Sequence, residues 1–103
     1  MTRALAAAAQ RSGARAALLA TEDGFLVAGT GAGYDLSALA AFAPTLSERR
    51  VRDNQALHEA TQGHSFLSAP IRVHGMQVFF ATIGESLGEV DRIEAAAGRI
   101  FAA

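Results

Sequence analysis

The sequence predicts an α/β domain of the α+β kind, with an antiparallel sheet packed against helices. An Asp-Gly pair at residues 23–24 separates two apolar runs, as in a β-hairpin. Residues 67–73 alternate between apolar and polar and lead through His74-Gly75 into another apolar run, which indicates a second strand pair. Helix-forming or helix-capping patterns stand near the start, the middle and the end of the chain.

Composition restricts the class of protein. The 103 residues, half of them apolar, have the size of one domain over residues 1–103, and the absence of Cys excludes disulfides and a thiol nucleophile. The net charge is −1, too little positive charge for a nucleic-acid partner. No apolar run approaches the ~20 residues that span a bilayer, so we expect no membrane insertion. The run Ala4–Ala9 is too short for a signal peptide, and we expect a cytoplasmic protein.

The first half of the chain predicts a helix followed by a hairpin. Ala-rich residues 2–12 favour a helix, and Gly13 is a natural stop. Residues 15–21 and 25–28 are nearly continuously apolar, which is typical of strands covered on both faces. Residues 29–33 are expected to form a loop.

The central helix is predicted to start at Leu36, with Asp35 as its N-cap. It is apolar almost all round, and a helix of this kind must be buried on every side. Pro44 should interrupt it, and the capping-box spacing of residues 45–48 allows a second helical piece. One face can cover the sheet, so the other needs a partner. The two faces are formed by Leu36, Ala40 and Ala43 and by Leu39, Phe42 and Leu46.

The second half predicts two or three strands and a helix. Residues 55–62 form either a short polar strand, which we favour, or a helical continuation to Glu59. The strand at 65–73 is expected to be irregular or bulged at Pro70, which lacks a ladder donor. Residues 76–83 form the next strand, and a capping box at 86–89 opens a helix to about residue 101.

The order and lengths of these elements resemble the roadblock (dynein light-chain) family over essentially the whole chain. The segments that carry the resemblance are the small-residue first helix, ARAALLATEDGFLVAGTG, DLSALAAFAPTL, FLSAPIRVHGMQVFFATIGES and LGEVDRIEAAAGRIF. The resemblance implies a five-stranded antiparallel sheet sandwiched between the central helix on one face and the two terminal helices on the other. It also implies dimerisation through the central helix and an edge strand. Bacterial and archaeal members often act beside Ras-like GTPases.

Residues that could carry catalysis are few. The Gly-rich segment 29–33 fits neither nucleotide-binding pattern and lacks the phosphate-binding Lys. His58, His64 and His74 match no compact metal-ligand spacing, and no serine stands in an activated-nucleophile motif. We therefore expect no catalytic residue, no metal and no cofactor.

The expected function is protein binding without catalysis, through homodimerisation and the scaffolding or regulation of a small Ras-like GTPase or related signalling or polarity protein. Leu39, Phe42 and Leu46 are the predicted dimer contacts, unless all three fill the chain's own core. The predicted partner surface is Arg49, Arg50, Val51 and Arg52, because Arg is enriched at interfaces; a solvated helix end is the alternative. The alternative function is a profilin- or sensor-like domain that holds a small molecule between sheet and helices.

Overall fold

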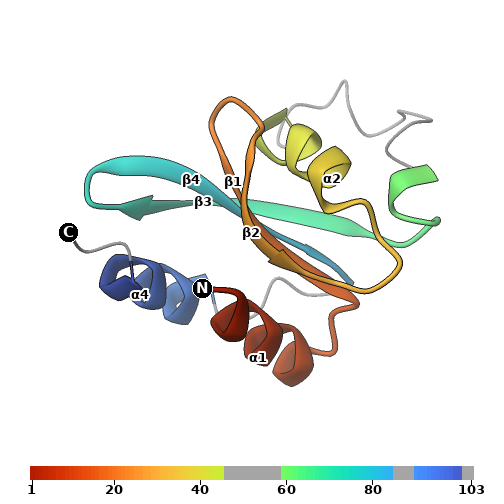
Figure 1. Cartoon of the computed structure of the whole chain (residues 1–103), viewed down its shortest axis with the longest axis horizontal. Helices are drawn as coiled ribbons and strands as arrows, with labels where there is room; N and C mark the ends of the chain where they lie inside the picture. Colours follow the sequence, from red (N-terminus) through yellow and green to blue (C-terminus); the bar gives the residue numbers. More distant parts are fainter. Residues whose placement is uncertain (46–58, 85–89, 101–103) are drawn as a thin grey trace.

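The fold is described by a computed structural model, which covers residues 1–45, 59–84 and 90–100 (Figure 1). Its elements, in chain order, are helix α1 (Thr2–Ser12), strands β1 (Ala16–Thr21) and β2 (Leu26–Thr30), helix α2 (Leu36–Phe42), the 3₁₀ turn η1 (Ala43–Thr45), strands β3 (Phe66–Val73) and β4 (Met76–Ile83), and helix α4 (Val90–Ile100). The expected α+β class with an antiparallel sheet is confirmed.

The sheet has four strands in the described part of the chain, in the order β2-β1-β4-β3. The fifth strand expected over residues 55–62 is wrong in its last four positions, and residues 55–58 lie outside the described part. Glu59 and Ala60 are helical, and residues 61–63 form a turn. Gln62 and Gly63 have φ angles of 56° and 80°, in the left-handed region that no strand uses. The helical Glu59 agrees with the second reading of the sequence, in which a helix continues to this residue.

The two faces of the sheet carry separate cores. On one face α2 packs against alternate residues of β1 and β4, among them Leu18 and Ile83. On the other face α1 and α4 lie side by side and cover the intervening residues, such as Phe80 (Figure 1). Successive strand residues point to opposite faces, so nearly continuous apolar runs in β1 and β4 supply both cores. The small alanines of α1 allow a close approach to the sheet.

The hairpin prediction needs one correction. β1 is buried almost throughout, but β2 is exposed at Leu26 and Val27 and only half-buried beyond them. β2 is an edge strand with β1 as its single neighbour, so its apolar sequence did not indicate cover on both faces. The strand also extends into the expected loop, as far as Thr30. Gly31 then passes so close to β1 that a Cβ there would lie 2.5 Å from the Cβ of Ala16.

The bulge expected at Pro70 is also wrong, because β3 pairs with β4 in one unbroken register from Phe66 to Val73. The backbone N–H of Arg72 donates to Glu94 Oε2 of α4 at 3.0 Å, so this N–H faces away from β4. Residues two apart on a strand direct their N–H groups the same way. The nitrogen of Pro70 therefore also faces outward, on an edge strand, where its missing donor costs no ladder bond.

The helix ends follow the sequence closely. Asp35 accepts a hydrogen bond from the N–H of Ala38 at 3.1 Å, as an N-cap does. The α-helical geometry stops at Phe42, and Pro44 lies in η1, which confirms the expected interruption. α1 spans the predicted residues and ends at Gly13, whose φ is 73°. The capping boxes at 45–48 and 86–89 fall largely or wholly outside the described residues.

Candidate protein-interaction surface

The predicted dimer contacts do not share one environment. Leu39 is 0% exposed and belongs to the core between α2 and the sheet, so the intramolecular alternative is correct for this residue. A side chain without exposed surface cannot contact a second chain, and the prediction for Leu39 is corrected accordingly. Phe42 is half-buried against the same core. Leu46 lies outside the described residues, as do Arg49, Arg50, Val51 and Arg52 of the predicted partner surface.

A different surface emerges where the two hairpins turn. Thr21 pairs with Val78, and Val73 pairs with Met76, so the β1–β2 turn and the β3–β4 turn lie at the same end of the sheet. The side-chain hydroxyl of Thr21 accepts the N–H of Phe25 at 3.1 Å, and the N–H of Thr21 donates to the Phe25 carbonyl at 2.9 Å. These two hydrogen bonds fix the backbone at Phe25, immediately after the turn.

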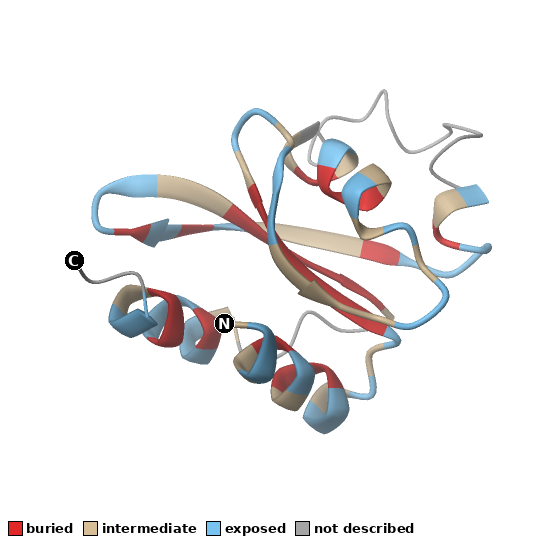
Figure 2. Cartoon of the chain, viewed as in Figure 1, coloured by how far each residue is buried: buried red, intermediate tan, exposed pale blue. Residues whose placement is uncertain are grey.

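Four large apolar side chains are exposed at this end. Leu26, at 37%, lines neither of the hollows described below, and the other three, Phe25 at 69%, Met76 at 68% and Val27 at 40%, line them. We call these three residues the hairpin-end patch. Figure 2 shows the turn of the β3–β4 hairpin as an exposed tip that projects beyond the helices. Isolated exposed apolar side chains are common on proteins, but a contiguous exposed apolar patch marks an interaction site.

The hairpin-end patch borders two adjoining hollows. One, of about 500 Å³, is lined almost entirely by apolar atoms and lies on the sheet face that carries α1 and α4; its lining residues are Leu19, Thr21, Val27, Val73, His74, Met76 and Val78. The other, of about 490 Å³, lies beside Phe25 and Met76 and includes the charged side chains of Glu22, Asp23 and Arg72. An apolar hollow with a charged rim is the usual anatomy of a protein interface.

The wall of the apolar hollow is held in place by α4. The Nε2–H of His74 donates to the carbonyl oxygen of Gly98 at 2.8 Å, and the guanidinium of Arg72 donates to the Gly75 carbonyl at 3.3 Å. The His74–Gly98 and Glu94–Arg72 hydrogen bonds tie the β3–β4 hairpin to the helix, and the Arg72–Gly75 hydrogen bond lies within the hairpin. His74 therefore has a structural partner in the fold.

Sequence reasoning missed the hairpin-end patch because it assigned Phe25 and Met76 to buried strands. The signal was their position: each directly follows the glycine of a tight turn, Gly24 or Gly75, and so lies at the tip of a hairpin. At these tips the contacts with α2 and α4 are made by Gly24 and His74, and the side chains of Phe25 and Met76 stay exposed.

The other candidate sites have fewer features that point to a function. No group of three or more His, Cys, Asp or Glu side chains within residues 1–45, 59–84 and 90–100 could hold a metal ion. The N-terminus of α2 is occupied by the Asp35 carboxylate, which disfavours a phosphate there. No helix in the described segments is long and apolar enough to cross a membrane.

Comparison with solved structures finds a similarity to Myxococcus xanthus MglB, with 18% sequence identity and a TM-score of 0.49 over 98% of this chain and 96% of that one. The similarity concerns the overall course of the chain, and we infer nothing about function from it. No family model matches the sequence, and no curated protein matches it.

Proposed function

We propose that this chain is a non-catalytic protein-binding module of the roadblock type, which self-associates and scaffolds or regulates a small Ras-like GTPase or a related signalling protein in the cytoplasm. The observation that carries the binding role is the hairpin-end patch. Full burial of a large apolar side chain contributes about 1.5–3 kcal/mol, so Phe25, Val27 and Met76 together offer a partner a substantial gain.

The partner class rests on the sequence resemblance, since family members often act beside Ras-like GTPases. The self-associating surface is proposed around Phe42 and Leu46, and Arg49, Arg50, Val51 and Arg52 remain proposed partner contacts. If this chain activates a GTPase, we expect it to act by stabilising the partner's own catalytic residues.

Self-association is tested by sedimentation velocity at micromolar concentration. The wild type is expected to sediment as a dimer, and Phe42→Glu as a monomer, because the substitution buries a charge in the interface. Phe42→Leu, which stays apolar, is the control and should remain dimeric. Circular dichroism must show that the Glu variant is folded. A monomeric wild type would contradict the proposal.

Partner binding is tested by affinity purification from the native lysate, followed by mass spectrometry and a direct binding titration. The double variant Phe25→Ser/Met76→Ser is expected to lose the partner, while Ile100→Ser, at an exposed apolar residue of α4 outside the patch, should retain it. If both variants retain the partner equally, the hairpin-end patch is not the surface that binds it.

A second candidate function is favoured by the apolar hollow itself, whose volume of about 500 Å³ is within the range of small-molecule sites. A sensor-like domain would hold an apolar ligand there. Titration of the ¹⁵N-labelled protein with decanoate distinguishes the two functions. Saturable shifts at Leu19, Val73 and Val78 would support a small-molecule site, and their absence would favour the protein-binding role.

A further inference from the structure

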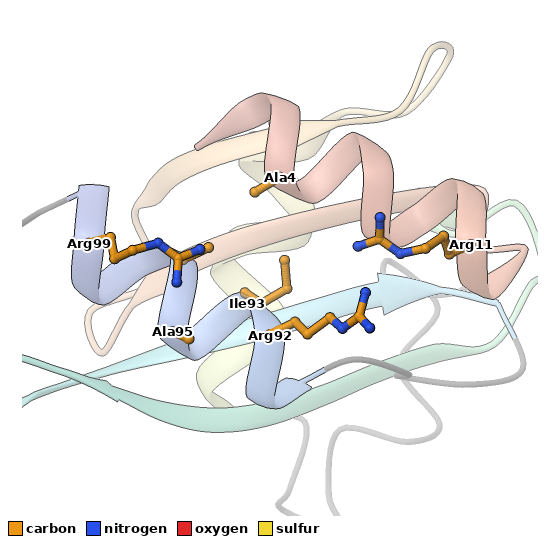
Figure 3. Close-up of a pocket in the computed structure, with 7 residues that line it drawn as sticks. Ala4, Arg11, Arg92, Ile93, Ala95 and Arg99 are labelled. Atoms are coloured by element: carbon orange, nitrogen blue, oxygen red, sulfur yellow. The ribbon is translucent and has the colours of Figure 1, made fainter.

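A groove runs between α1 and α4, on the outer side of the helix layer. Figure 3 shows Arg11 of α1 and Arg92 of α4 reaching toward each other at one end of this groove, with Arg99 at the other. The small side chains of Ala4, Ala95 and Ala96 line the groove, so little projects into it. Its volume is about 240 Å³. The helices that form it are terminal in sequence, far from the residues of the hairpin-end patch.

The charged side chains among the described residues that line this groove are all of one sign. The only charged side chains of α1 are Arg3 and Arg11, so the helix carries no acidic group. α4 has two acidic residues, Asp91 and Glu94, but neither lines the groove, and Glu94 accepts the hydrogen bond from the Arg72 N–H on the β3 side. Among the described residues that line the groove, every charged one is an arginine, although the whole chain has a net charge of −1.

The spacing of the arginines indicates which kind of anionic ligand fits the groove. Arg92 and Arg99 are seven residues apart on one helix, which is two turns or about 10 Å along the axis. A single small anion can meet both guanidinium groups only if the two long side chains bend toward each other, whereas an acidic peptide segment can present two carboxylates at that separation. A helix with acidic residues at positions i and i+7 has this spacing, and the alanine surface lets its backbone approach closely.

We infer that the α1–α4 groove binds an acidic helical segment of a partner protein, with Arg92 and Arg99 each pairing with one carboxylate and Arg11 flanking the first. Guanidinium groups favour this role because they form planar, bidentate hydrogen bonds with carboxylates. The inference does not rest on the proposed function: the groove lies on the side of the sheet opposite α2 and shares no lining residue with the hairpin-end hollows.

The test is an NMR titration of the complete ¹⁵N-labelled chain with an alanine-rich helical peptide of about 16 residues that carries two glutamates seven positions apart. Saturable amide shifts are expected at Ala4, Arg92 and Ala95, and the affinity should fall as salt rises. The charge-reversal variant Arg92→Glu/Arg99→Glu should weaken binding by roughly tenfold or more, since each lost charge-assisted hydrogen bond contributes about 1.5–3 kcal/mol. The matched control Arg3→Glu/Arg15→Glu changes the net charge equally at two exposed arginines that line neither the groove nor the hairpin-end hollows, and it should change the affinity less than about twofold.

Several results would overturn the inference. A peptide with both glutamates replaced by glutamine must bind more weakly, and so must one whose two glutamates lie on opposite faces of the helix; equal binding by either contradicts the spacing argument. If the groove variant and its control lose the same affinity for the peptide, binding depends on the net charge of the protein and not on the groove. Displacement of the peptide by millimolar inorganic phosphate would assign the groove to small anions. Tighter binding to phosphatidylserine vesicles than to the peptide would assign it to a membrane surface.

Discussion

Strands β1 and β4 run side by side through two very different environments. Where the helices cover the sheet, Phe80 and Ile83 of β4 are fully buried, and their β1 neighbours Leu19 and Ala16 are nearly so. At the hairpin end of the same strand pair, Met76 is 68% exposed, and Phe25 at the adjoining turn is 69% exposed. The residue types at the two ends are equally apolar.

The contrast teaches that helix cover, and not hydrophobicity, decides which apolar residues become core. α2 lies against Gly24 of the β1–β2 turn, and α4 is hydrogen-bonded to His74 of the β3–β4 turn, yet neither helix covers the side chains of Phe25 and Met76. Apolar side chains at the tips contribute little to folding and are available for association. Substitutions at the two ends of the strands should therefore separate stability from binding.

The largest effect is expected at the covered end. Phe80→Ala should reduce the free energy of unfolding by about 3–5 kcal/mol, because it removes a fully buried ring and leaves a cavity. Urea denaturation followed by circular dichroism measures this loss. A change below about 1 kcal/mol would mean that this end of the sheet is not the core.

A second large effect is expected where the chain passes closest to β1. Gly31 has a φ of 147°, and a Cβ there would meet Ala16 at 2.5 Å. Gly31→Ala should cost about 1–3 kcal/mol through strain and displacement. Gly33→Ala is the control: its φ is also positive but a Cβ there meets nothing within 4 Å, so it should cost less in the same denaturation experiment.

A smaller effect is expected at the β3 edge. Glu94→Ala removes the acceptor of the Arg72 N–H, which then turns to water, and should cost about 1 kcal/mol. Hydrogen exchange at the Arg72 amide should accelerate, while the Phe80 amide in the central strand β4 should exchange as before. Unchanged exchange at Arg72 would show that Glu94 does not protect this edge.

The smallest effect on stability is expected at the hairpin end. Phe25→Ser/Met76→Ser should change the free energy of unfolding by about 0.5 kcal/mol per site or less, because both side chains are already largely in water. Thermal denaturation beside Phe80→Ala provides the comparison. A loss as large as that of the Phe80 variant would place these residues in the core.

Much of this fold could be predicted from sequence because its signals are local. Short stretches of neighbouring residues predict four features: helix α1 with its stop at Gly13, the Asp35 cap, the interruption at Pro44 and both Gly-containing turns. Strand order is not local. Nothing near Leu26 tells that it lies on an edge strand. Pro70 fits either an edge strand or a bulge and does not decide between them, so the exposure of β2 and the regular pairing of β3 had to come from the structure.

The candidate site was harder to predict for the same reason. Leu39 has the pattern of an interface residue, yet it packs inside because the short α2 turns both Leu39 and Ala40 toward the sheet. Phe25 and Met76 have the pattern of core residues, yet their side chains are exposed, because the helices contact the turns at Gly24 and His74 and leave these two side chains uncovered. Periodicity predicts which residues share a face but not how far a neighbouring element extends over it.

The central claim, that the hairpin-end patch is a protein-binding surface, is tested most directly by photo-crosslinking in the native cell. p-Benzoylphenylalanine is placed at residue 25 in one strain and at residue 100 in another, because Phe25 and Ile100 are both exposed apolar residues and only the first belongs to the patch. The account predicts a discrete crosslinked product from position 25 that contains one defined partner, is absent from position 100 and disappears when Met76→Ser is added. The same products from both positions, or none from position 25, would contradict it.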